Sequence, residues 1–153
     1  MKEEVEIEIK LCSEWHNDPP AFTVMIDDQL IGAGRVLEKE ADNEFKSVTW
    51  KGELEPGEHT LTISYRGKNI GKRHTILDDA GNIVKDQILS IDGVLIDNID
   101  LGNIAIKLGK YHTNNSDGGN HPPLFEGKRS FGMNGDWKFT FSVPTYMWLL
   151  ENL

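Results

Sequence analysis

The chain has 153 residues, of which 38% are hydrophobic, and it carries a single cysteine and a formal net charge of −9. This length suits one domain spanning residues 1–153 that buries a core without disulfides, because one cysteine cannot form a bridge within the chain. The acidic balance argues against nucleic acid as a partner, since nucleic-acid binders gain affinity by releasing counterions from phosphates. No apolar run approaches the roughly 20 residues of a membrane helix, so no membrane insertion is expected.

The first half of the chain alternates apolar and polar residues with a period of two, which is typical of strands with one face in water. Residues 5–11 form the first such run. Residues 22–26 and 30–37 flank two aspartates, which predicts a hairpin. A further strand is predicted at residues 45–54, and the turn E-P-G-E that follows leads into another at residues 59–65.

The second half begins with residues 75–97, where five aspartates lie among alternating aliphatic residues. Residues 104–108 add a short apolar run, and residues 109–123 form a long polar segment of the kind that serves as a functional or mobile loop. Residues 137–141 alternate aromatic and polar side chains. About nine short strands separated by turn residues predict an all-β fold, an antiparallel β-sandwich of jelly-roll type with a short apolar C-terminal segment.

The aspartate-rich stretch supports two interpretations. Calcium prefers six to eight oxygen ligands, and some of these oxygens are available from four side chains: Asp78, Asp79, Asn82 and Asp86. The simpler interpretation is a hairpin whose tip, D-D-A-G-N, consists of residues that favour turns. Because the spacing does not match an EF-hand, we favour the hairpin tip and keep calcium as the alternative.

Three segments resemble small jelly-roll carbohydrate-binding modules of the calcium-dependent xylan-binding class. They are F-T-V-M-I-D-D-Q-L-I-G from residue 22, E-P-G-E-H-T-L-T-I from residue 55, and D-Q-I-L-S-I-D-G-V from residue 86. The resemblance covers about residues 20–100 and implies a jelly-roll fold with a calcium ion held in part by Asp86. Ile88 stands where that class has asparagine, and R-G-K at residues 66–68 stands where it has an Asn-Asp pair, so two expected ligands are absent.

A second resemblance covers nearly the whole chain. Small proteins encoded by tailed phages of marine bacteria and cyanobacteria are similar in K-D-Q-I-L-S-I-D, in I-D-N-I-D-L-G and in the closing G-x-W-x-F-x-F-x-x-P-x-Y-x-W-L-L-E-N. This similarity implies a virion or infection context. The single cysteine, Cys12, fits synthesis in a reducing cytoplasm, so we expect a protein that is made in the host cytoplasm, is placed in the virion and contacts other virion proteins or copies of itself. The N-terminal residues contain no apolar signal region, which agrees with that expectation.

Two aromatic residues are candidates for stacking against sugar rings, because the flat faces of Trp and Tyr match the apolar C–H faces of pyranoses. Trp15 lies among loop-forming residues, and Tyr111 borders the polar segment. An equally good interpretation of Trp15 is that it closes one end of the sandwich, since tryptophan is usually well buried.

The C-terminal run Y-M-W-L-L is apolar on all sides. One interpretation is a short turn or helix that packs over the sandwich, as apolar segments usually do. The other is an exposed surface that docks another copy or a virion partner through Tyr146, Trp148 and Leu149.

The sequence does not support an enzyme. Its five histidines match no metalloenzyme spacing and no nucleophile motif is present; His112 and His121 flank a loop with Asp117 that we interpret as solvated. The first hypothesis is therefore a non-enzymatic virion accessory protein, a decoration or tail appendage with a carbohydrate-module fold. The alternative is a calcium-assisted module that binds a host surface glycan, and a third hypothesis is a protein that binds a host factor during infection.

Overall fold

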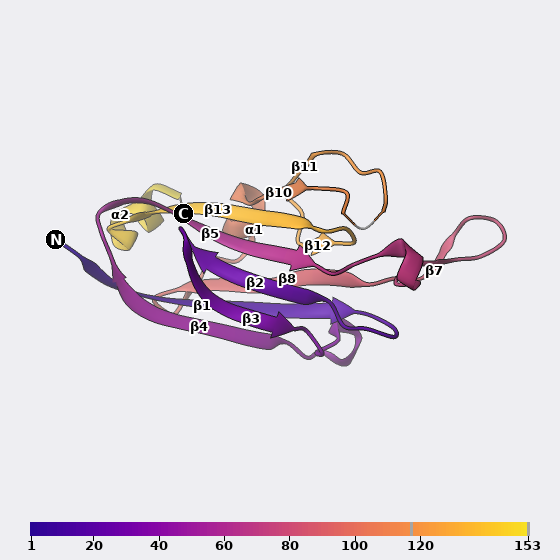
Figure 1. Ribbon diagram of the computed structural model, residues 1–153. Helices are drawn as coiled ribbons and strands as arrows, with labels where there is room; N and C mark the ends of the chain where they lie inside the picture. Colours follow the sequence, from indigo (N-terminus) through magenta and orange to yellow (C-terminus); the bar gives the residue numbers. More distant parts are fainter. Residues whose placement is uncertain (117, 153) are drawn as a thin grey trace.

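The computed structural model describes residues 1–116 and 118–152, and it consists of two antiparallel sheets packed face to face (Figure 1). The first sheet has the strand order β12-β8-β1-β4, with β9 paired to β8. The second sheet has the order β11-β10-β13-β5-β2-β3. Asp117, which the sequence places in the polar loop, lies outside the described residues. No helix in the described ranges is long and apolar enough to cross a membrane.

The bounds of the elements are as follows. The strands of the first sheet are β1 (Glu3–Glu14), β4 (Lys46–Leu54), β8 (Ile88–Ile96), β9 (Ile99–Asp100) and β12 (Ser130–Phe131). Those of the second sheet are β2 (Ala21–Ile26), β3 (Gln29–Arg35), β5 (Gly57–Arg66), β10 (Lys110–Thr113), β11 (Leu124–Glu126) and β13 (Gly135–Val143). A separate hairpin is formed by β6 (Ile76–Leu77) and β7 (Ile83–Lys85), and the helices are α1 (Asn103–Leu108) and α2 (Thr145–Asn152), with short 3-10 turns at Glu40–Asp42 and Ile70–Lys72.

The core lies between the two sheets and is built by the predicted alternation. In β1, which pairs with both β4 and β8, every second side chain from Val5 to Leu11 is fully buried. In the facing sheet, Trp137, Phe139 and Phe141 of β13 point inward and form a row of stacked rings. Because side chains of a strand alternate between its two faces, this pattern sets one face of each sheet against the other. The predicted all-β antiparallel sandwich is confirmed.

The short apolar run at residues 104–108, counted among the strands by its composition, is helical instead. The helix α1 ends where the Gly109 amide donates to the Ala105 carbonyl (2.8 Å). Gly109 is required there because the Trp137 indole packs against it, and an added Cβ would lie 2.2 Å from Trp137 Nε1. Five residues are too few for their spacing to distinguish a strand from a helical turn.

The C-terminal helix α2 packs over the sandwich, as the first interpretation of that segment predicts. The Trp148 ring meets Phe139 edge to face, with 5.6 Å between centroids, and Leu149 is also buried. At the start of the helix the Thr145 amide donates to Glu3 Oε2 (3.1 Å), and its hydroxyl lies 3.0 Å from Asp97 Oδ2. These contacts attach the end of the chain to the first sheet.

A histidine–aspartate pair fastens the β2–β3 turn to β5. Asp27 accepts hydrogen bonds from His59 Nδ1 (2.7 Å) and the Thr60 amide (3.0 Å), and His59 Nε2 lies 2.7 Å from the Glu55 carbonyl oxygen. Burial is the largest single influence on the pKa of His59 and lowers it, but the bonds to Asp27 and Glu55 together outweigh burial, so the pKa is raised. The charged imidazolium is therefore the form that the fold favours, because both of its ring nitrogens then donate to an acceptor.

This pair predicts a pH-dependent contribution to stability. A group whose pKa is raised by folding stabilises the fold fully below its unfolded value, about 6.5 for histidine, and the contribution is lost as the pH rises through the folded value. We expect the wild type to have a higher free energy of unfolding than Asp27→Asn at pH 5.5, and this difference to decrease as the pH is raised to 9. Urea denaturation of both proteins across this range measures it. A difference that stays constant from pH 6 to 9 would contradict this assignment.

Candidate functional site

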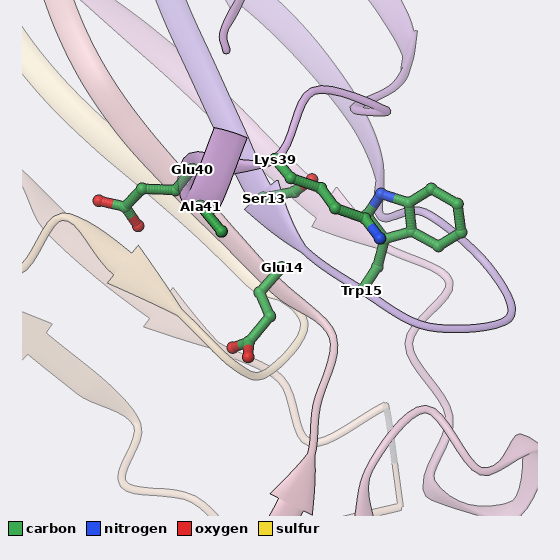
Figure 2. A pocket seen from close by; sticks show the side chains of 6 residues that line it. All are labelled: Ser13, Glu14, Trp15, Lys39, Glu40 and Ala41. Atoms are coloured by element: carbon green, nitrogen blue, oxygen red, sulfur yellow. The ribbon is translucent and has the colours of Figure 1, made fainter. Parts of the chain in front are cut away.

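Trp15 lies where the chain leaves β1, at one end of the sandwich. Its indole Nε1 donates to the Leu37 carbonyl (3.3 Å), and the Lys39 ammonium lies 4.5 Å from the ring centroid. Figure 2 shows the Lys39 side chain reaching toward the indole. The side chain of Trp15 is half-buried, so the ring is both held in place and open to solvent on part of its surface.

Two adjoining hollows flank this tryptophan, and we call them together the Trp15 cleft. The larger has a volume of about 450 Å³ and is lined by Ser13, Glu14, Trp15, Lys39, Glu40 and Ala41 (Figure 2). The smaller, of about 270 Å³, is lined by Glu14, Trp15, His16, Val84, Lys85 and Asp86. Because Glu14 and Trp15 line both hollows, the two lie side by side. The larger hollow alone is within the range of small-molecule sites, which run from about 300 to 1,000 Å³, and the smaller one extends it.

The chemistry of the Trp15 cleft suits a polyhydroxylated ligand. The carboxylates of Glu14 and Glu40 point away from the indole, toward the other side of the hollow (Figure 2). Glu40 Oε1 is already paired with Arg129 Nη2 (2.8 Å). Hydroxyl groups in this hollow would therefore meet the Glu14 carboxylate as an acceptor and the Lys39 ammonium as a donor. The sequence indicates Trp15 through its loop-like surroundings, but Lys39 and Glu40 are 24 and 25 residues away and only the fold brings them beside it.

Tyr111 does not belong to any exposed surface, so its predicted role as a second sugar platform is not supported by its position. The side chain is 1% exposed and stacks on Phe131, with 3.9 Å between ring centroids. Its hydroxyl donates to the Met133 carbonyl (2.6 Å). The polar segment that begins at Gly109 in the sequence in fact starts with the strand β10, whose alternation turns Tyr111 inward opposite Trp137. The expectation of an exposed ring was wrong for this reason.

Of the three predicted metal ligands at the hairpin tip, Asp78 and Asn82 are engaged by the turn itself, whereas Asp79 is exposed. Asp78 Oδ1 accepts hydrogen bonds from the amides of Ala80 and Asn82, each at 2.9 Å. The bond from Asn82 is the largest of the causes that hold the pKa of the Asp78 carboxyl below its ordinary value. Figure 1 shows this hairpin, β6–β7, projecting from the end of the sandwich. Across residues 1–116 and 118–152, no group of three or more His, Cys, Asp or Glu side chains is placed to hold a metal ion.

Asp86, the fourth predicted ligand, is paired with a buried lysine. Lys68 Nζ lies 2.5 Å from Asp86 Oδ1 and also donates to the Gly132 carbonyl. The same carboxylate oxygen accepts bonds from the Thr75 hydroxyl (2.7 Å) and the Gln87 amide (2.8 Å). The side chain of Lys68 is 2% exposed. Asp86 is therefore surrounded by donors, one of them a cation.

These residues do not fit a calcium site at Asp86. Calcium needs six to eight oxygen ligands, whereas the groups around this carboxylate are an ammonium, a hydroxyl and an amide. Lys68 belongs to the segment that stands where the calcium-dependent class has its Asn-Asp pair. The lysine is evident from the sequence, but its contact with Asp86 is not. The fold creates that contact by placing the end of β5 beside the start of β8.

The three predicted docking residues of α2 are separated by the structure. Trp148 and Leu149 are 8% and 5% exposed and belong to the core, whereas Tyr146 is 67% exposed. Two further apolar side chains of the helix, Met147 and Leu150, are 54% and 59% exposed. The apolar surface of the helix is thus formed by Tyr146, Met147 and Leu150, which we call the α2 patch.

The buried ion pair predicts a large effect of removing one partner. Lys68→Met should destabilise the protein by about 3–5 kcal/mol, because it leaves Asp86, whose side chain is 12% exposed, without its cation. Urea denaturation measures this loss, with Lys85→Met as a control at an exposed lysine, where a change within about 0.5 kcal/mol is expected. The double variant Lys68→Met/Asp86→Leu should recover most of the loss. A Lys68→Met variant as stable as the control would show that the pair is not formed.

Comparison with known proteins yields similarity in fold and none in sequence. No family model and no curated protein matches the chain. Among solved structures, vCBM60 in complex with galactobiose is similar with a TM-score of 0.55 and 7% sequence identity, over 88% of this chain and 96% of that one. The selenomethionine form of vCBM60 is similar with a TM-score of 0.55 and 9% sequence identity, over 88% of this chain and 89% of that one. Its description refers to circular permutation as a link between two families of calcium-dependent carbohydrate-binding modules. The chain therefore has the fold of a carbohydrate-binding module.

Proposed function

We propose that this protein is a non-catalytic glycan-binding module and that the sugar lies in the Trp15 cleft. The observation that carries the proposal is the aromatic ring held between two hollows that are rimmed by carboxylates and ammonium groups. The fold supports it, since similar structures are carbohydrate-binding modules. Fold alone does not carry function, so the proposal depends on the cleft.

The contacts around the ring suggest how a sugar would lie. Lys39 lies over one face of the Trp15 indole, and we place the apolar face of a pyranose against the opposite one. Glu14, which lines both hollows, would accept hydrogen bonds from the hydroxyl groups at the edge of that pyranose. Stacking supplies affinity with little specificity, and the carboxylates would select the sugar by the positions of its hydroxyls.

We further propose that sugar binding here does not depend on calcium. The support is the Lys68 ammonium on Asp86 together with the turn bonds of Asp78. The alternative is a calcium-assisted module in which Asp78, Asp79, Asn82 and Asp86 rearrange around the ion. The two differ in one respect that is simple to measure, which is the effect of a chelator on binding and on thermal unfolding.

The test is titration calorimetry against neutral galacto- and xylo-oligosaccharides, in calcium and in chelator. Trp15→Ala should weaken binding at least tenfold, which corresponds to about 1.4 kcal/mol, and chelator should change neither affinity nor melting temperature. Glu14→Gln, at an exposed side chain, should also weaken binding without loss of stability. Tyr146→Ala removes an exposed aromatic ring elsewhere and serves as the matched control. Unchanged binding by Trp15→Ala would sink the proposed site, and binding abolished by chelator would favour the calcium-assisted alternative.

A structural role in a phage particle is the second candidate function, and the α2 patch is the observation that favours it. Tyr146, Met147 and Leu150 present adjoining apolar side chains to solvent, and such patches commonly mark contact surfaces. In this role the protein would be a decoration or appendage component, held by another virion protein or by a second copy. Glycan binding and particle attachment are compatible, because the patch and the Trp15 cleft involve different residues.

The α2 patch predicts that attachment of the protein to phage particles can be lost without loss of its stability. The triple variant Tyr146→Ser/Met147→Ser/Leu150→Ser should keep its unfolding free energy within about 1 kcal/mol, because these side chains are exposed, yet be lost from particles of the phage that encodes it. Trp148→Ala, in contrast, should cost about 3–5 kcal/mol through a cavity beside Phe139. Quantitative mass spectrometry of purified particles and urea denaturation measure the two effects. Absence of the wild-type protein from particles would exclude the structural role.

A further inference from the structure

The outer face of the second sheet carries a cavity that has no part in the Trp15 cleft. Its volume is about 620 Å³, larger than either hollow of that cleft. Polar side chains from three neighbouring strands line it, and these are Lys110, His112, Lys138, Thr140 and Thr60. Leu108, at the end of α1, and Trp148, on α2, contribute its apolar wall. A concave site with an apolar wall and a few convergent polar groups is typical of ligand-binding pockets.

Two lysines of neighbouring strands lie side by side in this cavity. Lys110 of β10 is directly opposite Lys138 of β13 in the antiparallel ladder, and both side chains are exposed. Like charges in directly opposite positions of a sheet destabilise it. In a chain with 25 acidic residues against 16 basic ones, this local accumulation of positive charge runs against the overall balance.

The lysines are not neutralised by carboxylates of the described residues. None of the ion pairs found within residues 1–116 and 118–152 includes Lys110 or Lys138. Glu126 is opposite Lys110 on the other side, in β11, but forms no ion pair with it. Asp136, the acidic residue of β13 nearest to Lys138 in sequence, is engaged by Arg66 (2.8 Å) and the Ser64 hydroxyl (2.7 Å). Both ammonium groups are therefore available to an anion.

Hydroxyl and imidazole groups lie beside the charged pair. Thr140 is opposite Thr60 in the ladder between β13 and β5, and it lies two residues from Lys138 on the same face of the strand. His112 has the same relation to Lys110. This arrangement offers donors and acceptors for hydroxyl groups around a centre that attracts negative charge, with an apolar wall for C–H groups. An acidic sugar combines these three features in one ligand.

We propose that this cavity is a second binding site, specific for an acidic saccharide whose carboxylate or sulfate group lies between Lys110 and Lys138. The saccharide class rests on the proposed glycan-binding function, whereas the requirement for an anion rests on the lysine pair alone. Binding would also remove the repulsion between the two ammonium groups, so a bound anion stabilises the β10–β13 pairing.

The test is titration calorimetry in 150 mM NaCl with three probes: an oligogalacturonate, its methyl ester, and a sulfated galacto-oligosaccharide. The ester keeps the sugar chain and removes the charge. We expect at least one of the two anionic probes to bind, the ester to bind at least tenfold more weakly, and Lys110→Gln/Lys138→Gln to lose at least tenfold in affinity for the anionic probe. The control Lys2→Gln/Lys51→Gln removes the same charge from a different part of the surface, where these lysines pair with Glu55 and Glu4, and should bind as the wild type does.

Three results would overturn the inference. They are the absence of binding by both anionic probes, equal binding by the lysine double variant and the wild type, and equal binding of the acid and its ester. Equally tight binding of oligoglutamate would overturn the saccharide assignment in favour of an acidic peptide.

Failure of this inference can be distinguished from failure of the proposed glycan-binding function, because that function is tested with neutral sugars and with Trp15→Ala. Loss of acidic-sugar binding in Trp15→Ala but not in the double variant would place the anion in the Trp15 cleft. Because Lys110 and Lys138 are exposed, their replacement by glutamine should not unfold the protein. A melting temperature of the double variant at or above that of the wild type would show that a loss of binding is not due to misfolding.

Discussion

The buried ion pair between Lys68 and Asp86 is the contact on which the arrangement of one end of the sandwich depends. Lys68 follows β5 of the second sheet, Asp86 precedes β8 of the first, and the lysine also donates to Gly132, which follows β12 of the first. One ammonium group therefore holds the two sheets together at the end where the chain leaves β1. Asp86 also lines the smaller hollow of the Trp15 cleft. The ion pair therefore fixes the position of one wall of the cleft.

An ammonium and a calcium ion would fasten the same carboxylate with different consequences for a sugar. Calcium keeps several coordination positions and can accept a sugar hydroxyl in one of them. The Lys68 side chain is 2% exposed, and its ammonium offers only hydrogen-bond donors, which face protein oxygens. A ligand cannot be bound through such a cation. In the proposed glycan-binding role, recognition in the Trp15 cleft would therefore rest on the indole and on Glu14. This is a direct mode of binding, on a fold shared with a module described among calcium-dependent ones.

Local patterns of the sequence were sufficient for the fold but not for the site. The alternation in β1 and β13 directly reflects the burial of one strand face, and it is visible without knowledge of partners. Tyr111 was misplaced because a four-residue strand at the start of a polar segment is too short for its alternation to stand out. Lys39 lies 24 residues from Trp15 in sequence, and Lys68 lies 18 residues from Asp86. The opposition of Lys110 and Lys138 depends on strand register, which no local pattern specifies.

The lysine pair on the second sheet has to be considered against the charge of the whole chain. A net charge of −9 repels acidic polymers at long range, but charges more than a Debye length away, about 8 Å at physiological ionic strength, are largely screened. An anion between Lys110 and Lys138 would be in contact with both ammonium groups, so their attraction is screened least. Rising salt therefore weakens the distant repulsion before it weakens the local attraction. A cavity of this kind can capture an acidic sugar at physiological salt although the protein as a whole is acidic, and the repulsive surroundings restrict capture to ligands that place their anionic group in contact with both lysines.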